Sequence, residues 1–280
     1  MPELPEVETV CRGLAKRLVG RRLIRVEQRR PGLRLPFPED MPARLTGRQV
    51  TAIRRRAKYL LIHLDDGWVV IAHLGMSGRL VISEAPGPPP GRHDHVILGT
   101  DDGAVVTFND ARRFGLMTLA PEADLTMHPL LAGLGPEPLA PEFTSTALSA
   151  RLAGRGTPIK AALLDQTVVA GLGNIYVCEA LFHAGISPFR PAATVAGPAA
   201  GRLVPAIRRV LTAAIAAGGS SLRDYVQTSG ELGYFQHQFA VYDRAGQPCP
   251  GCRCTVAETG GIQRLTQANR STYYCPRRQD

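Results

Sequence analysis

A proline-rich break in the middle of the chain sets the first limit on its fold. Residues 135–141 read Gly-Pro-Glu-Pro-Leu-Ala-Pro, with three prolines in six positions. Proline fixes its own backbone angle and lacks an N–H, so this segment cannot continue a helix or a strand. A chain of 280 residues has room for about two domains. We therefore expect a linker at residues 135–143 between two differently built halves.

The half before the linker has the pattern of an antiparallel sheet. From residue 23 to residue 119, short apolar runs alternate with turn signals, and Asp-Asp-Gly occurs at residues 65–67 and again at residues 101–103. Both Asp-Asp-Gly turns lie between apolar runs, which predicts two hairpins. An amphipathic helix precedes the sheet, because apolar residues recur at helical spacing between Val7 and Leu18, and Glu6 suits the positive end of the helix dipole.

The half after the linker is helical and ends in a small cysteine-rich segment. Residues 144–218 are alanine-rich with helical periodicity, and four of the six cysteines follow residue 248. The predicted fold class is α+β: an N-terminal helix with an antiparallel β-sandwich, a helical domain and a small cysteine-rich C-terminal domain. The predicted domains are residues 1–134, 144–240 and 241–280, with the linker at 135–143.

Charge points to a polyanionic partner. The net charge is +9 and the pI is near 9.6, although the content of charged residues, 20%, is ordinary. The first 25 residues carry no apolar signal core, and no run of about 18 apolar residues occurs. We expect a cytoplasmic protein that binds nucleic acid.

The start of the chain offers an unusual nucleophile. Removal of Met1 would leave Pro2 as a free secondary amine, and an α-amino group titrates near pH ~8, well below lysine. Such an amine can attack a sugar C1′ and form an iminium. Glu3 follows directly and can transfer protons. The simpler alternative is that Pro2 and Glu3 only lead into the helix.

The string Pro-Glu-Leu-Pro-Glu-Val-Glu-Thr at residues 2–9 closely resembles the N-terminus of the formamidopyrimidine-DNA glycosylases, bacterial enzymes that excise oxidised purines such as 8-oxoguanine. Later strings are similar to this family in the same order. They are Arg-Ala-Lys-Tyr-Leu at residues 56–60, the Gly-Leu-Gly-Asn turn at 171–174 and the finger at 267–275. The resemblance implies a helix-two-turn-helix domain at residues 144–240, a zinc finger at 241–280 and a loop over the flipped base within residues 220–235.

The resemblance also implies the site residues. It implies catalytic roles for Pro2, Glu3, Lys58 and Arg270. It implies DNA contacts for Met76, His93, Arg112, Phe114 and Asn174. Among these, Met76, Arg112 and Phe114 would fill the space left by the extruded nucleotide, since flipping a base costs a few kcal/mol. Arg155 and Lys160 precede a short apolar helix, and we expect both to contact phosphate.

The cysteines predict one structural zinc ion. Cys249 and Cys252 form a CxxC pair, which is strong evidence for half of a zinc site. The family closes the site with a second CxxC, but here Arg278 stands where that last cysteine would be. Cys275 is the third ligand. The fourth is Cys254, or it is water or the Asp280 carboxylate, or else the β-hairpin that the family has before its second CxxC is held by packing with little or no metal.

We therefore predict a monomeric, bifunctional DNA glycosylase and AP lyase that excises 8-oxoguanine and formamidopyrimidines from duplex DNA in base excision repair. Pro2 forms a Schiff base, and β,δ-elimination follows. No redox or nucleotide cofactor is implied. One alternative is an endonuclease VIII-like enzyme for oxidised pyrimidines. The others are a non-catalytic protein that binds damaged DNA, and a zinc-ribbon module fused to an unrelated sandwich.

Overall fold

The computed structural model describes residues 2–221 and 225–280. Its contacts divide the chain into two compact units, residues 1–132 with 215–236 and residues 133–214 with 237–280. Met1, whose removal we expect, lies outside the described residues, as do residues 222–224 of the predicted loop over the flipped base.

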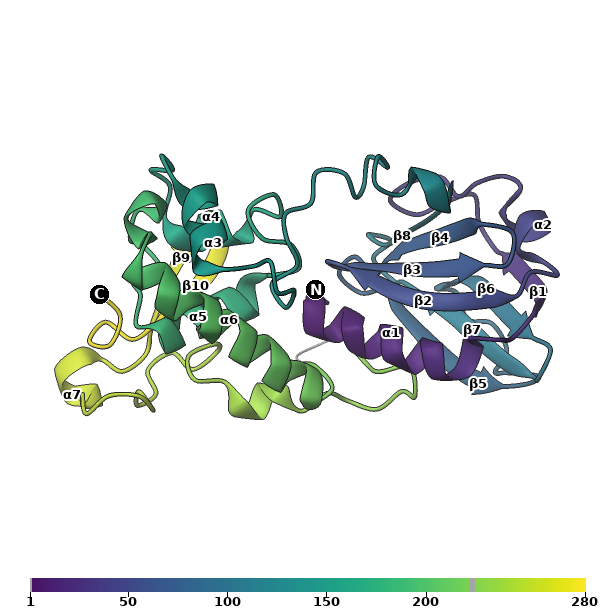
Figure 1. Cartoon of the computed structure of the whole chain (residues 1–280). Coiled ribbons are helices and arrows are strands. Elements are labelled where there is room, and N and C mark those ends of the chain that lie inside the picture. Colours follow the sequence, from purple (N-terminus) through teal and green to yellow (C-terminus); the bar gives the residue numbers. More distant parts are fainter. Residues whose placement is uncertain (1, 222–224) are drawn as a thin grey trace. The chain divides into compact units, whose positions relative to one another are not determined.

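The first unit contains the predicted antiparallel sandwich (Figure 1). Its two four-stranded sheets have the orders β1-β6-β7-β5 and β2-β3-β4-β8. The strands are β1 (Leu23–Gln28), β2 (Val50–Arg56), β3 (Tyr59–Leu64), β4 (Trp68–His73), β5 (Arg79–Glu84), β6 (Asp94–Thr100), β7 (Ala104–Asn109) and β8 (Leu116–Pro121). Both predicted hairpins are confirmed, because β3 pairs with β4 across residues 65–67 and β6 pairs with β7 across residues 101–103.

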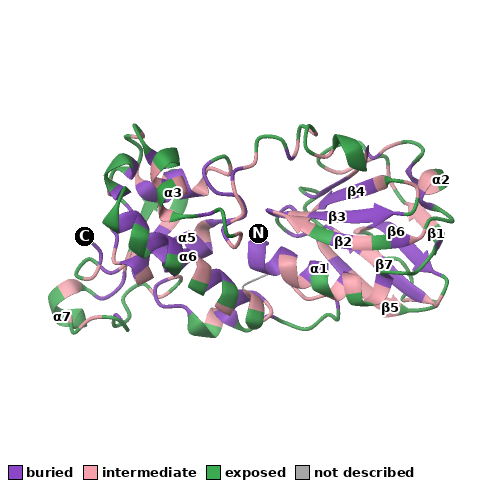
Figure 2. Ribbon diagram, viewed as in Figure 1, coloured by how far each residue is buried: buried purple, intermediate pink, exposed green. Residues whose placement is uncertain are grey.

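Apolar side chains from both sheets and from one face of α1 (Leu4–Leu18) form the core of this unit. The spacing of Val7, Val10, Leu14 and Leu18 places all four on that face, as predicted. Figure 2 shows the buried residues along β3 and β4 and at the start of α1. The short helix α2 (Met41–Leu45) adds two buried side chains to the same core, and the 3-10 turn η1 (Glu122–Asp124) follows β8.

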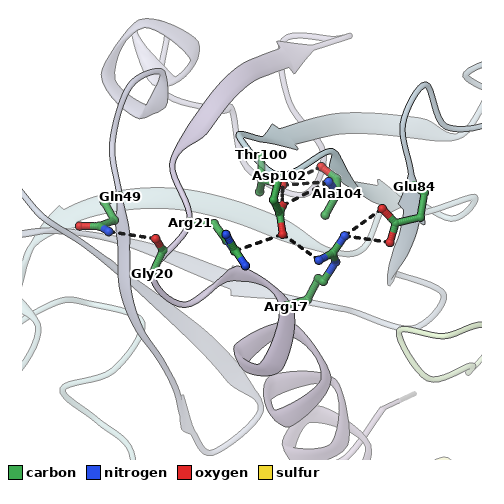
Figure 3. Close-up of polar contacts among 8 residues, drawn as sticks. All are labelled: Arg17, Gly20, Arg21, Gln49, Glu84, Thr100, Asp102 and Ala104. Carbon is green, nitrogen blue, oxygen red and sulfur yellow. Dashed lines mark hydrogen bonds and ion pairs between the residues drawn. The ribbon is translucent and has the colours of Figure 1, made fainter.

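The C-terminal end of α1 is tied to the β6–β7 turn by charged side chains (Figure 3). Asp102 Oδ2 lies 2.7 Å from Arg17 Nη1 and 3.1 Å from Arg21 Nε, and its Oδ1 accepts from Thr100 Oγ1 at 2.6 Å. The hydrogen bond from Thr100 and the two guanidinium groups hold the pKa of Asp102 below its usual range. These contacts fix the direction of the helix, and so the position of its opposite, N-terminal end.

The second unit is helical and carries a C-terminal hairpin. Its helices are α3 (Ser145–Leu152), α4 (Ile159–Leu164), α5 (Asn174–Ala184), the 3-10 turn η2 (Ala192–Val195), most of α6 (Pro198–Ala216), part of the 3-10 turn η3 (Phe235–Gln238) and α7 (Val256–Thr259). Strands β9 (Gln263–Gln267) and β10 (Arg270–Tyr274) pair through a turn in which Ala268 and Asn269 have positive φ, as in a tight hairpin. The predicted fold class is therefore confirmed.

A buried carboxylate on α5 fixes the chain that leads to the hairpin. Glu179 accepts the backbone N–H groups of residues 240, 241 and 242 at 2.8 to 2.9 Å. Each would otherwise be a buried donor without a partner, which is costly. Residues 135–143, all of them described, contain neither helix nor strand. Within residues 2–221 and 225–280, no helix is both long and apolar enough to cross a membrane.

Candidate active site

The predicted catalytic pair, Pro2 and Glu3, is buried at the start of α1. Glu3 is 3% exposed and occupies the N-cap position. Its backbone N–H donates to Glu6 Oε2 at 2.8 Å, while Glu6 Oε1 accepts the N–H of Ser220 at 2.8 Å. The Glu6 carboxylate therefore connects the N-terminal residue Glu3 to Ser220, in the segment that follows α6. From the sequence we gave Glu6 only a favourable interaction with the helix dipole, although a Glu three residues after the cap is the signal for this bond.

Lys58 lies on the turn between β2 and β3, at the same end of the unit as the start of α1. Helix α1 and strand β2 run in opposite directions. Cys11 Sγ is 3.6 Å from Ile53 O, whereas Glu8, earlier in the helix, accepts through Oε2 from Nε of Arg55, later in the strand, at 2.8 Å. Continuing this pairing towards residue 2 leads to the β2–β3 turn (Figure 1). Lys58 is 7% exposed, so its ammonium group is largely withdrawn from water.

His73, at the end of β4, is a residue of this site that we did not predict. It pairs with Tyr59, and the two ring centroids are 4.9 Å apart. Burial, followed by the charge of Lys58, lowers the pKa of His73 to about 4, so the ring is neutral at neutral pH. Its Nδ1 accepts the N–H of Gly75 at 2.9 Å, and this bond orients the turn that carries Met76. The signal in the sequence was a histidine directly before Leu-Gly-Met-Ser-Gly.

Asp110 organises the two loops that carry the predicted void-filling residues. Its side chain is 0% exposed and accepts from Ser77 Oγ at 2.6 Å and from the Gly115 N–H at 2.7 Å. The Arg112 N–H donates in turn to Ser77 Oγ at 3.0 Å. The Asp110 N–H donates to His93 O at 3.0 Å, which adds the third predicted segment to the network. We predicted none of these bonds, and the two to Ser77 join positions 33 and 35 residues apart.

The void-filling residues lie together and reach solvent. Met76 is 37% exposed and Phe114 is 46% exposed, which is high for apolar side chains. The Arg112 guanidinium lies over the Phe114 ring, 4.9 Å from its centroid. A Cβ atom added at Gly75 would overlap the Phe114 backbone, so the close approach of the two loops requires glycine. The structure thus brings Met76, Arg112 and Phe114 onto one surface.

In the second unit, Gln166 holds the predicted Gly-Asn turn. Its Oε1 accepts the N–H of Gly171 at 2.9 Å, and its Nε2 donates to Leu172 O at 3.0 Å. Asn174, the first residue of α5, donates through Nδ2 to Ser271 O at 2.9 Å. These bonds fix the conformation of the turn. We gave Gln166 no role from the sequence, because its spacing from the turn does not distinguish it from a surface residue.

Lys160 lies inside the second unit. It is 1% exposed, and its Nζ donates to Thr272 Oγ1 at 2.7 Å and to Ser271 O at 3.1 Å. The burial of Lys160 and its two bonds to β10 favour a role in holding the hairpin, rather than the direct phosphate contact that we predicted. Arg155 is partly exposed and pairs with Asp165, whose Oδ2 is 3.1 Å from its Nη1. Arg270 is exposed at the first position of β10, directly before the carbonyl that Lys160 and Asn174 bind.

Four cysteines form the candidate metal centre. The Sγ atoms of Cys249, Cys252, Cys254 and Cys275 all lie within 4.8 Å of one another. Four thiolates at about 2.3 Å from a tetrahedral zinc ion would be about 3.8 Å apart. The distances from Cys275 Sγ to the Sγ atoms of Cys252 and Cys254, 3.7 and 3.8 Å, match this value. All four cysteines are free of disulfides, so the cluster fits one metal ion.

Comparison with known proteins gives the same assignment for both units. The model of the formamidopyrimidine-DNA glycosylase N-terminal domain matches residues 1–117, and that of the formamidopyrimidine-DNA glycosylase H2TH domain matches residues 134–226. The formamidopyrimidine-DNA glycosylase of Rhodospirillum centenum is 65% identical to this chain, and the alignment covers 100% of both.

Solved structures agree with this result. The crystal structure of the MutM (Fpg) protein of Thermus thermophilus has a TM-score of 0.86 and 40% identity, and the match covers 99% of this chain and 98% of that one. Lactococcus lactis Fpg in complex with DNA that contains an abasic site has a TM-score of 0.88 and 34% identity, with 99% of each chain covered. The chain belongs to the formamidopyrimidine-DNA glycosylase family.

Proposed function

We propose that this protein is a bifunctional DNA glycosylase and AP lyase that removes oxidised purines, 8-oxoguanine and formamidopyrimidines, from double-stranded DNA in base excision repair. The observation that carries the proposal is the buried Pro2-Glu3 pair at the end of the sandwich where Lys58 lies. It is supported by the names of full-length relatives, and by Lactococcus lactis structures solved with DNA that contains Fapy-dG or an abasic site. The protein acts as a monomer in the cytoplasm.

The proposed chemistry begins at the N-terminal amine. After Met1 is removed, the Pro2 nitrogen attacks C1′ of the flipped nucleotide, the N–C1′ bond forms, and the glycosidic bond breaks with release of the base. Glu3 supplies and removes protons at the opening sugar. The tie from Glu6 to Ser220 keeps this pair in place. Near neutral pH an α-amino group is far more often unprotonated than a lysine, so no strong shift of its pKa is needed.

Strand cleavage needs groups that stabilise the departing phosphates. We assign this role to Lys58 in the first unit and to Arg270 on the finger, which support β- and δ-elimination. Lys58 is buried beside neutral His73, and Arg270 is held through Ser271 O. The exposed trio Met76, Arg112 and Phe114 fills the space left by the nucleotide and contacts the orphaned base. His93, Asn174 and Arg155 contact the DNA backbone.

A zinc ion at the cysteine cluster completes the proposed finger. The cysteines of the cluster would hold the ion, which would neutralise their thiolates and join the segment around Cys249 and Cys252 to the end of β10 at Cys275. We assign the sandwich to residues 1–134, the helix-two-turn-helix domain to 144–240 and the finger to 241–280, with the linker at 135–143.

The test is excision from duplexes that carry either 8-oxoguanine opposite cytosine or an oxidised pyrimidine. We expect faster release of the purine. Pro2→Gly and Glu3→Gln should abolish release while binding persists. Glu84→Gln, which loses an exposed ion pair to Arg17 far from the site, should leave release unchanged. Preference for the pyrimidine would indicate an endonuclease VIII-like enzyme, and binding without any release would indicate a damage-binding protein.

A further inference from the structure

The finger departs from the family pattern at Arg278, and it carries one further cysteine, Cys254, beside its CxxC pair. We propose that Cys254 is the fourth ligand of the zinc site, and that Arg278, at the place of the family's last cysteine, is now a protein cross-link between the finger and α5. The inference rests on the zinc ion proposed above. It concerns which side chains hold the finger together, and so can fail while the glycosylase assignment stands.

Four clustered cysteines can supply all the ligands of the zinc site. Three of the four clustered sulfur atoms come from the short segment Cys249, Cys252 and Cys254, and the fourth comes from Cys275 at the end of β10. Cys254 Sγ is 3.8 Å from Cys275 Sγ, as close as a tetrahedral site requires. The Gly251 N–H points at Cys249 Sγ at 3.4 Å, a bond of the kind that orients metal-binding thiolates. A complete set of four sulfur ligands is thus present without residue 278.

The side chain of Arg278 bonds both to α5 and to the CxxC turn. Its Nε donates to Phe182 O at 3.1 Å, its Nη1 donates to Gly251 O, and its guanidinium lies over the Phe182 ring, 4.9 Å from the centroid. Phe182 belongs to the last turn of α5, where carbonyl groups lack helical partners and a cation is favourable. One side chain therefore joins the CxxC turn to the end of the helix.

The Arg278 guanidinium and the Phe182 ring pack closely against Gly251. A Cβ atom added there would lie 2.9 Å from both Arg278 Nη1 and Phe182 Cζ, so the turn accepts the guanidinium because this residue has no side chain. The terminal segment is also held by bonds that do not involve a cysteine sulfur atom. Gln279 Oε1 accepts the Cys275 N–H at 2.8 Å, and Gln279 Nε2 donates to Ile186 O at 2.9 Å. Arg278 is thus held at the helix end by its own contacts with Phe182 and Gly251.

The experiment measures zinc and stability separately in the full-length protein. Zinc per chain and zinc affinity, by competition with a chromophoric chelator, are determined for wild type, Cys252→Ser, Cys254→Ser and Arg278→Ala. Thermal unfolding of the zinc-loaded proteins is measured alongside. Arg277→Ala, an exposed neighbour, is the matched control for Arg278. Cobalt substitution adds a spectroscopic count of thiolates, because sulfur-to-cobalt absorbance grows with the number of sulfur ligands.

We expect Cys254→Ser to weaken zinc binding as strongly as Cys252→Ser, by roughly a hundredfold or more for the loss of one thiolate. Its sulfur-to-cobalt absorbance should fall to about three quarters of the wild-type value, as for three thiolates in place of four. Arg278→Ala should keep one zinc ion per chain and lower the Tm by about 3–6 °C, whereas Arg277→Ala should change neither. If Arg278→Ala does not fold, Arg278→Lys should show the same separation with a smaller shift.

Wild-type zinc affinity in Cys254→Ser would overturn the ligand assignment, as would a wild-type protein that binds no zinc at all. Equal Tm values for Arg278→Ala and Arg277→Ala would overturn the cross-link. Excision of 8-oxoguanine by the wild-type protein is measured on the same preparations, so a failure of the proposed function is recognised independently of the metal result.

Discussion

Replacing Asp110 by Asn should loosen the two loops that carry the void-filling residues. The carboxylate is completely buried and accepts from Ser77 Oγ at 2.6 Å and from the Gly115 N–H at 2.7 Å. An amide of the same shape can keep its oxygen opposite only one of these donors. The best arrangement keeps the bond to Gly115 and turns the amide NH₂ towards Ser77, because a hydroxyl can also accept a hydrogen bond.

The size of the effect follows from this rearrangement. A hydrogen bond to a charged group contributes about 1.5–3 kcal/mol and a neutral one about 0.5–1.5 kcal/mol. Weakening two bonds while a neighbouring hydroxyl loses its acceptor should therefore lower the free energy of unfolding by about 2–3 kcal/mol. At about 2–4 °C per kcal/mol for a chain of this size, the Tm should fall by about 4–12 °C.

Thermal unfolding and single-turnover excision on an 8-oxoguanine duplex test this prediction. We expect slower excision by Asp110→Asn, with a smaller loss on a duplex whose site is already abasic, because no base then has to be extruded. Ser77→Ala, which removes only one of the donors, should show a smaller decrease in both quantities. Wild-type stability and wild-type excision in Asp110→Asn would refute this account of the loops.

Three further predictions concern other buried polar groups. The pKa of His73 is about 4 in the folded state and near 6.5 when unfolded, so the unfolded state binds more protons between these values and stability falls as the pH drops from 6.5 to 4. The free energy of unfolding lost over this pH range is at most about 3 kcal/mol. The variant His73→Asn should therefore show a flatter dependence of this free energy on pH, measured by urea unfolding. Glu179→Gln should lower the Tm by several degrees, because an amide oxygen accepts fewer of the three N–H groups; an unchanged Tm would contradict this. Lys160→Met should lower the free energy of unfolding by only about 1–2 kcal/mol, because Ser271 O keeps its hydrogen bond from Asn174. The same substitution should slow the strand cleavage that we assign to Arg270. Equal cleavage rates in the variant and the wild type would contradict a role of Lys160 in positioning the hairpin.

The sequence predicted the elements whose signals are local. The hairpins at residues 65–67 and 101–103 and the helix with apolar residues between Val7 and Leu18 each depend on turn chemistry or periodicity within a dozen residues. The fold class followed from these signals together with the family resemblance. The same local reasoning found the CxxC pair at Cys249 and Cys252.

Contacts between distant positions could not be predicted in this way. The bond from Asp110 to Ser77 spans 33 residues, and that from Glu6 to Ser220 spans 214. Nothing in the spacing of such residues distinguishes a buried acceptor from a charged group on the surface. Lys160 illustrates the same limit, because its position before an apolar helix suggested a phosphate contact and nothing in the spacing showed that its side chain is buried.

The central claim is that Pro2 carries the reaction, and borohydride trapping on a duplex with 8-oxoguanine opposite cytosine tests it most directly. Borohydride reduces an iminium to a stable amine and so fixes the attacking nitrogen to C1′. Mass spectrometry of the intact protein first establishes that Met1 has been removed. We predict a covalent adduct whose peptide map places the DNA on Pro2. An adduct on Lys58, or no adduct from a folded and processed protein that still binds the duplex, would contradict the account.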